Sequence, residues 1–332
     1  MNRQIRIVLN YFLGPVILVL LSWSLYRQLL QQPDLLQRWT EISGSLKDLR
    51  LWLVVVLMVA NWGMESWKWM LLVREMQPGY SFGRAFRAVL AGCSITMLTP
   101  NRIGEYGGRM LFVEPENRLR AISLALVGSI SQLLITLIAG VSALIILRYF
   151  LQPVSGELAV LPHFWGDVLL GSSTMVMLLV ALFYWKIAWL AQIIDRLPFM
   201  KRVQQHVSVI ETLQNLLLAK ILSLSGLRYL IFVAQYLLML QLMGVNLPWF
   251  TGCCLIALFY LMMALAPTIG FIELPLRVGA LWLLLKPYSG NELGVGAAAL
   301  GIWIINLVLP AITGSLFLLR IRIQEKGKAR SA

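Results

Sequence analysis

The sequence predicts an all-α polytopic membrane protein with about six spanning helices and two re-entrant helical hairpins related as inverted repeats. Of the 332 residues, 59% are apolar and only 13% are charged, and the mean hydropathy is +0.78. A soluble domain needs a far more polar surface, so this balance indicates a membrane protein. The apolar runs are continuous, whereas a transmembrane β-strand alternates apolar and polar residues, so the runs predict helices.

Six apolar runs predict spanning helices, because a helix rises about 1.5 Å per residue and a bilayer core is about 30 Å thick. The first run has a basic start but no small-residue cleavage site after it, so we expect a retained helix rather than a signal peptide. We expect residues 1–332 to form a single transmembrane domain. The predicted spans are 7–26, 51–73, 121–147, 168–185, 229–243 and 293–319.

The net charge of +13 comes from cations at the ends of the apolar runs, so it predicts a membrane surface and no nucleic-acid partner. The stretch 186–206 holds four Lys and Arg, and the tail 320–330 is also basic. We therefore expect both termini on the cytoplasmic side of the cytoplasmic (inner) membrane, although the loop 27–50 then places four cations outside. Residues 207–224 are amphipathic, so 186–225 predicts a cytoplasmic and interfacial linker.

A proline-broken stretch interrupts the apolar sequence near position 100. The apolar arm before it, 88–98, has eleven residues and reaches about half of a bilayer core. Thr99 and Pro100 then supply an N-cap and a first helical residue for a new helix that extends to about position 113. Segment 82–113 therefore predicts a re-entrant hairpin.

The second half of the chain repeats this arrangement. A second apolar arm ends in Pro267, and Glu273 and Arg277 follow with the same spacing of four as Glu105 and Arg109. We expect a hairpin over 249–285 that enters from the opposite face, although its first arm is also long enough to span. The inverted repeats would then be 51–148, with hairpin 82–113, and 228–320, with hairpin 249–285.

Charged side chains within apolar sequence are costly, so they predict a functional site. Helix N-termini attract anions, and arginine offers bidentate donors that suit phosphate. The glutamates would hold the arginines, or bind a cationic head group or a proton; an ordinary structural pair at i, i+4 is the alternative. The candidate substrate-binding residues are Pro100, Arg102, Glu105, Arg109, Glu273, Arg277, Glu65 and Asn61.

Other polar residues have simpler interpretations. Lys68 lies near the end of its span, where its side chain can snorkel to the surface. Gln132, Gln235 and Asn306 are expected to form hydrogen bonds between helices. No His, Cys, Asp or Glu cluster has metal-ligand spacing, and no nucleophile is grouped with His or Asp in the apolar segments. We therefore expect no metal, no cofactor and no intramembrane enzyme activity.

The first hairpin resembles the lysylphosphatidylglycerol synthase/flippase transmembrane family in its sequence Leu98-Thr99-Pro100-Asn101-Arg102-Ile103-Gly104-Glu105, followed by Arg109 and the run 121–147. The turn 269–273 and the small residues of 294–301 fit the second half of that family, and the resemblance covers about residues 5–320. It implies a membrane domain that translocates lipid. Synthase members carry a soluble aminoacyl-transferase domain after it, and this sequence ends at Ala332, so the resemblance implies the translocating part alone.

These features favour a lipid flippase-like transporter for an anionic or head-group-modified lipid, either a phospholipid or a polyprenyl-phosphate-linked lipid. The expected partner is then the membrane lipid itself. The alternative is a non-transporting subunit that scaffolds a lipid- or glycan-assembly enzyme. Under that alternative the Glu-Arg pairs are structural, and exchanging Glu105 with Arg109 would be tolerated.

Overall fold

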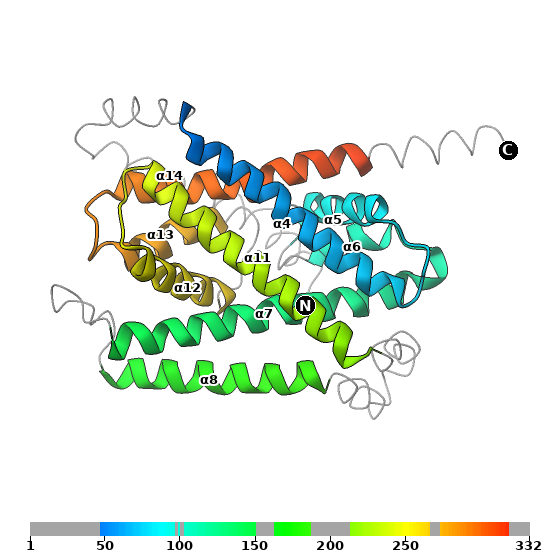
Figure 1. Cartoon of the computed structure of the whole chain (residues 1–332), viewed down its shortest axis with the longest axis horizontal. Helices are drawn as coiled ribbons and strands as arrows, with labels where there is room; N and C mark the ends of the chain where they lie inside the picture. The colour runs from blue at the N-terminus through cyan, green and yellow to red at the C-terminus, as the bar shows by residue number, and fades with distance from the viewer. Residues whose placement is uncertain are drawn as a thin grey trace, which may run out of the picture.

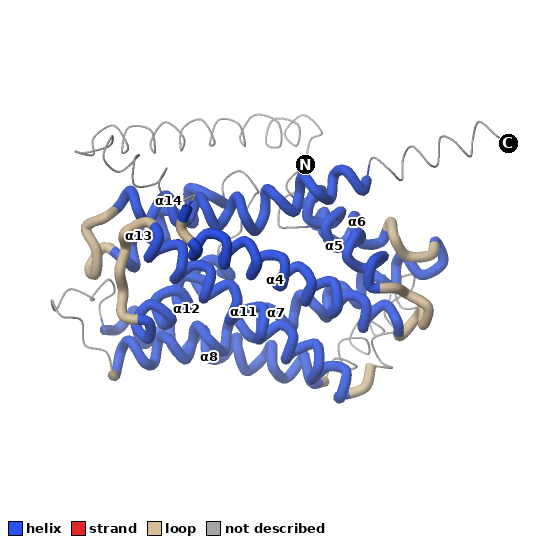
Figure 2. The backbone as a smooth tube through the Cα atoms, turned by 45° about the horizontal axis from the view of Figure 1, so that its top comes forward, coloured by secondary structure: helices blue, strands red, loops and turns tan. Residues whose placement is uncertain are grey.

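The computed structural model describes residues 47–96, 99, 103–150, 163–186, 213–265 and 273–318. Within these ranges the chain is helical and contains no strand (Figure 2). Five helices there are long and apolar enough to cross a membrane, which confirms a polytopic all-α protein; the predicted span 7–26 lies outside the described residues. The five are Leu49–Arg74, Pro115–Tyr149, Gly166–Trp185, Asn215–Leu242 and Glu292–Leu318.

Two long helices form the middle of the molecule. Helix α4 (Leu49–Arg74) and helix α11 (Asn215–Leu242) pack side by side and run diagonally through the view of Figure 1. Helix α7 (Arg118–Tyr149) and helix α8 (His163–Trp185) lie along one side of them, and α14 (Glu292–Trp303) lies along the other. The central pair therefore contacts elements from both halves of the chain.

Helix α11 is longer than the sequence predicts. We expected an interfacial helix over 207–224 and a short span from position 229, but one continuous helix covers Asn215–Leu242. That prediction is wrong because Ser225 and Arg228 do not mark the end of the span. Ser225 Oγ lies 3.4 Å from Lys68 Nζ, and Arg228 Nε donates to Asn61 Oδ1 at 2.8 Å. Polar partners inside the bundle thus compensate for burying these side chains.

Helices α5 (Phe82–Thr96) and α6 (Ile103–Met110) form the first predicted hairpin. Thr99 Oγ1 accepts the backbone N–H of Gly104, in the first turn of the described α6, at 2.8 Å. The predicted first helical residue, Pro100, lies outside the described residues. The described part of α6 ends at Met110, a few residues earlier than predicted. A 3₁₀ turn, Pro115–Asn117, then leads into α7.

Two glycines allow α5 and α6 to touch backbone to backbone. A Cβ on Gly108 would lie 2.4 Å from the Gly92 Cα, and a Cβ on Gly92 would lie 2.8 Å from the Glu105 carbonyl oxygen. Small residues permit this close approach between helices in a membrane. The contact holds α6, and with it Glu105 and Arg109, firmly against α5.

Helices α12 (Trp249–Leu265) and α13 (Glu273–Leu285) form the second hairpin. It lies at the opposite end of the molecule from α5 and α6 (Figure 1). Helix α12 packs closely on α7, since a Cβ on Gly140 would lie 2.6 Å from the Leu261 Cβ. The chain then enters α14, where Asn291 Oδ1 accepts the N–H of Gly294 at 2.9 Å and caps the helix.

The last helix is interrupted by a π-helical turn, Ile304–Val308, and continues to Leu318. Its backbone is in contact with α5. Cys93 Sγ lies 3.8 Å from the Leu307 carbonyl oxygen, and Ser94 Oγ donates to the Ala311 carbonyl at 2.5 Å. The first hairpin therefore contacts the final helix of the chain, and the second hairpin contacts α7.

The glycine contact predicts a clear difference between two adjacent alanine variants. Gly108→Ala places a methyl group against Gly92 and should lower the free energy of unfolding by about 1–3 kcal/mol. Gly107→Ala meets nothing within 4 Å and should leave the stability unchanged or slightly raised, because alanine favours helices. Thermal unfolding of both variants in detergent measures this. A Gly108→Ala melting temperature at or above that of Gly107→Ala would show that the two helices are not in close contact.

Candidate functional site

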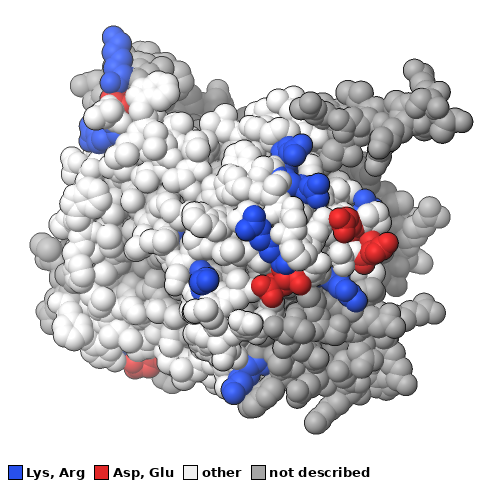
Figure 3. Space-filling model, turned by 45° about the vertical axis from the view of Figure 1, so that its right-hand side comes forward, with Lys and Arg blue, Asp and Glu red and all other residues white. Residues whose placement is uncertain are grey.

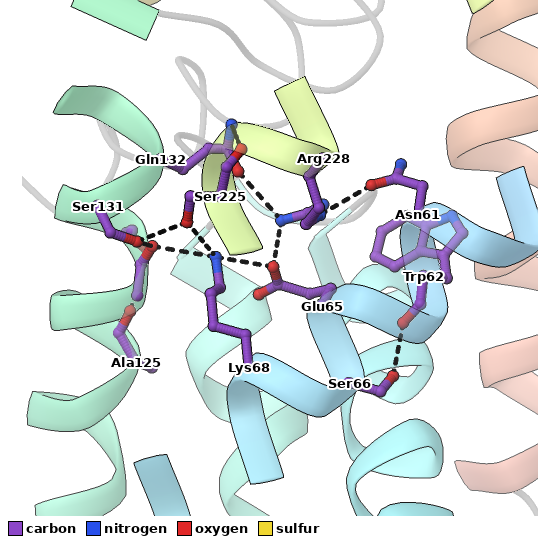
Figure 4. A network of polar contacts seen from close by, with 12 residues as sticks. Asn61, Trp62, Glu65, Ser66, Lys68, Ala125, Ser131, Gln132, Ser225 and Arg228 are labelled. Carbon is purple, nitrogen blue, oxygen red and sulfur yellow. Dashed lines mark hydrogen bonds and ion pairs between the residues drawn. The ribbon is translucent and has the colours of Figure 1, made fainter. Parts of the chain in front are cut away.

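Glu65 lies at the centre of a buried ionic cluster formed by α4, α6 and α11. Its side chain is only 5% exposed, yet three cations contact it. Lys68 Nζ lies 2.9 Å from Glu65 Oε2, and Arg228 Nη1 also bonds Oε2 (Figure 4). Arg109 Nη2 lies 2.7 Å from Oε1. An unpaired charge at this depth would cost several kcal/mol, so the cations stabilise the carboxylate and are stabilised by it.

Helical spacing explains how three helices supply this cluster. Asn61, Glu65 and Lys68 are four and three residues apart on α4, which places their side chains on one face. Ser225 and Arg228 share a face of α11 for the same reason. Because α4 and α11 pack side by side, the two polar faces meet inside the bundle.

Arg109 links the first hairpin to α4. Besides Glu65 it bonds Glu105 on its own helix, and its guanidinium lies 5.3 Å from the centre of the Trp69 ring, a cation–π distance. The residue is 3% exposed, and its Nε has no hydrogen-bond partner among the described residues. Buried donors in proteins are almost always paired. An unpaired buried nitrogen is therefore unusual, and the Arg109 Nε can donate a hydrogen bond to a ligand.

Neutral oxygens complete the surroundings of Lys68 and Arg228. Lys68 Nζ donates to the Gly128 carbonyl at 3.2 Å, and Gln132 Oε1 lies 3.4 Å from Arg228 Nη1. Ser131 and Ser225 exchange a hydrogen bond of 2.8 Å beside them (Figure 4). Helix α7 therefore contributes oxygens but no charge to the cluster.

The cluster contains more cations than carboxylates. Lys68, Arg109 and Arg228 face Glu65 and Glu105, which leaves one positive charge in excess among the described residues. Nδ2 of the fully buried Asn61 is a second donor without a partner in the described part of the chain. The arrangement can bind an anion, because it offers charge and unpaired donors together.

Glu273 and Arg277 form a different kind of site on α13. Arg277 Nε and Nη2 lie 3.0 and 2.5 Å from the same Glu273 oxygen, and Nη1 donates to the Tyr236 hydroxyl at 3.2 Å. The Tyr236 ring packs against Phe259, with ring centres 5.2 Å apart. Among the described residues, one cation meets one carboxylate here, so the Glu273–Arg277 pair has no excess charge.

The predicted site residues divide between these two places. Asn61, Glu65, Glu105 and Arg109 come together in the buried cluster, and Glu273 and Arg277 form the α13 pair. Pro100 and Arg102 lie outside the described residues. In the described ranges, no group of three or more His, Cys, Asp and Glu residues is placed to hold a metal ion.

Sequence reasoning missed two members of the cluster. The prediction that Lys68 snorkels to the surface is wrong, since it is 1% exposed and ion-paired with Glu65. The predicted span 229–243 leaves out Arg228, although Ser225 and Arg228 share a helical face within a continuous apolar stretch. That shared face was the signal for a polar contact inside the bundle.

The predicted interhelical hydrogen bonds are confirmed. Gln235 Nε2 donates to the Val54 carbonyl at 2.9 Å, which joins α11 to α4. Asn306 Nδ2 donates to Gln235 Oε1 at 3.0 Å, and Gln132 contacts Arg228 of α11.

Comparison with known families decides the identity of the domain. Residues 8–314 match the family described as the lysylphosphatidylglycerol synthase TM region. The chain belongs to this family. Membership in the lysylphosphatidylglycerol synthase TM family confirms the resemblance seen around Thr99 and Glu105, and it identifies a multi-pass membrane domain of a lipid-related flippase or synthase type. Comparisons with curated proteins and with solved structures gave no match.

The charge cluster predicts that Glu65 has a large structural role in this family member. Glu65→Gln keeps the shape of the side chain but leaves three buried cations without their shared carboxylate, which should cost about 3–5 kcal/mol of unfolding free energy. Glu75→Gln, at the exposed end of α4, should change it by no more than about 0.5 kcal/mol. Chemical unfolding in detergent measures both, and equal stabilities would contradict the central role of Glu65.

Proposed function

We propose that this protein is a lipid flippase-like transporter that moves an anionic lipid, a phospholipid or a polyprenyl-phosphate-linked lipid, across the cytoplasmic membrane. The observation that carries the proposal is the excess positive charge around Glu65, buried among helices long enough to span a bilayer. Among the described residues, three cations face two carboxylates there, which favours a role beyond a balanced structural ion pair. Arginine and lysine are the side chains that bind phosphate.

The positions of the hairpins support a pathway open to both sides of the membrane. The α5–α6 and α12–α13 hairpins lie at opposite ends of the molecule (Figure 1). Glu105 and Glu273 are 168 residues apart in the sequence, as are Arg109 and Arg277. This is the pattern expected of inverted repeats whose broken helices enter from opposite faces.

The packing of the hairpins supports the same interpretation. Helix α5 contacts the final helix, which belongs to the second half, and α12 contacts α7, which belongs to the first half. Each hairpin thus contacts the opposite repeat as well as its own. A rocking movement of one half against the other would carry the hairpins relative to the central helices, as alternating access requires.

Surface charge favours one orientation. The end of the molecule that carries the α5–α6 hairpin shows several Lys and Arg side chains among a few acids (Figure 3). By the positive-inside rule we place this end in the cytoplasm. The exposed cations at these helix ends are Arg74, Arg84, Arg87, Arg120 and Lys220.

Removing the Arg109 guanidinium tests the proposal. In phosphatidylcholine vesicles containing acyl-labelled phosphatidylglycerol, we expect the wild type to move the labelled lipid between leaflets and Arg109→Gln to fall to the level of protein-free vesicles. The matched control is Arg148→Gln, which removes a partly exposed ion pair with Asp167 outside the cluster. Gel filtration and thermal unfolding confirm that each variant is folded. Unchanged movement in a folded Arg109→Gln protein would refute the binding role of Arg109.

The scaffold alternative needs a different test from the one that the sequence indicates. Exchanging Glu105 with Arg109 would bring a carboxylate to the position where Arg109 meets Glu65. The exchange is therefore unfavourable under either function and does not separate them. Lipid movement by the purified wild type separates the two functions, because a non-transporting subunit moves no lipid by itself.

A further inference from the structure

We infer that the site selects a lipid whose head group is anionic and carries no ammonium group, such as a phosphodiester with hydroxyl or sugar substituents. The inference rests on the proposed function and narrows its substrate. The inference comes from the ion pairs that the two carboxylates of the cluster, Glu65 and Glu105, already form with cations of this chain. A carboxylate that recognises an ammonium group needs an oxygen that is not already held by a cation.

Glu65 has no such oxygen. Arg109 bonds Oε1, and both Lys68 and Arg228 bond Oε2. A head-group ammonium would have to displace one of these cations while the other two remained beside it. Repulsion between like charges is strong at such short distances in a buried site, so the exchange is unfavourable.

Glu105 is held in a similar way, but it is the more accessible of the two acids. Its side chain is 27% exposed, and its Oε1 accepts a hydrogen bond from Arg109. A phosphate that reaches Arg109 from this side can replace the Glu105 oxygen on Nη2 and also use the unpaired Nε. Two parallel bonds from one guanidinium to a phosphate are a favourable geometry.

The charge balance leads to the same substrate class. A phosphodiester brings one negative charge, which offsets the single positive charge in excess among the described members of the cluster. A zwitterionic head group adds an ammonium to surroundings that are already positive, and a cationic head group adds more. The interpretation that the glutamates bind a cationic head group is therefore disfavoured, because both Glu105 and Glu273 hold arginines.

The test compares three acyl-labelled lipids with the full-length protein in phosphatidylcholine vesicles. Phosphatidylglycerol is anionic without an amine, phosphatidylethanolamine is zwitterionic, and lysylphosphatidylglycerol is cationic. We expect phosphatidylglycerol to move about tenfold faster than either of the others, which corresponds to about 1.4 kcal/mol. Equal or faster movement of an amine-bearing lipid overturns this inference while leaving transport intact. If no lipid moves, the proposed function itself is wrong. Uptake of inorganic phosphate without lipid movement would assign the site to a soluble anion and overturn the lipid assignment.

A charge variant tests the same inference without a transport readout. Glu105→Gln raises the excess charge of the cluster from one to two and releases Arg109. Native mass spectrometry should then show about tenfold tighter binding of added phosphatidylglycerol and no gain for phosphatidylethanolamine. Glu116→Gln, which removes an exposed acid outside the cluster, should bind both lipids as the wild type does. Weaker binding of phosphatidylglycerol in Glu105→Gln would mean that Glu105 contacts the lipid directly, which contradicts the inference.

Discussion

The shared carboxylate of Glu65 is the interaction on which the arrangement of the helices depends. It connects α4 to the first hairpin through Arg109 and to α11 through Arg228. None of these cations could remain buried without a negative partner, because desolvation of an isolated charge costs several kcal/mol. Arg109 Nη2 holds the first hairpin to α4 through Glu65 and also bonds Glu105 of its own helix, so any further anionic partner of this nitrogen competes with these carboxylates. An anionic substrate is one such partner, which is why the structural contact and the proposed binding event involve the same atoms.

The surroundings of the arginines in the two hairpins are similar in layout but differ in charge. In both hairpins the arginine lies against an aromatic residue of a central helix, Trp69 for Arg109 and Tyr236 for Arg277. The residue 168 positions after Glu65 is Val233, which is buried and apolar. Among the residues that the structure describes, Arg277 therefore pairs with one carboxylate, Glu273 of its own helix, and no second cation is ion-paired there. The excess charge among the described residues therefore favours the first half for the proposed anion site.

Local features of the sequence predicted most of the fold, and part of the site. The spans follow from the length and hydropathy of apolar runs, and the break before α6 follows from Thr99 and its neighbours, so both are encoded within a short window. The roles of Lys68 and Arg228 are not encoded within such a short window of the sequence. Arg228 and its partner Glu65 are 163 residues apart in sequence. When a charged residue is considered without its partner, it is expected at the membrane surface, because burying it in the bilayer is costly. Only the packing of α11 on α4 shows that the two side chains compensate each other.

Helix α11 contacts both ionic sites, and this limits how the hairpins can move. Arg228 bonds Glu65 in the first site, and Tyr236, eight residues later on the same helix, bonds Arg277 of the second hairpin. Eight residues of helix span about 12 Å, and a continuous packed helix moves as a rigid rod over that distance. A displacement of α11 at the buried cluster therefore also displaces Tyr236 and its contact with Arg277. Under the proposed transport cycle, a phosphate that replaces Glu105 at Arg109 changes the contact between α6 and the central helices, and α11 provides the physical connection through which the second hairpin responds.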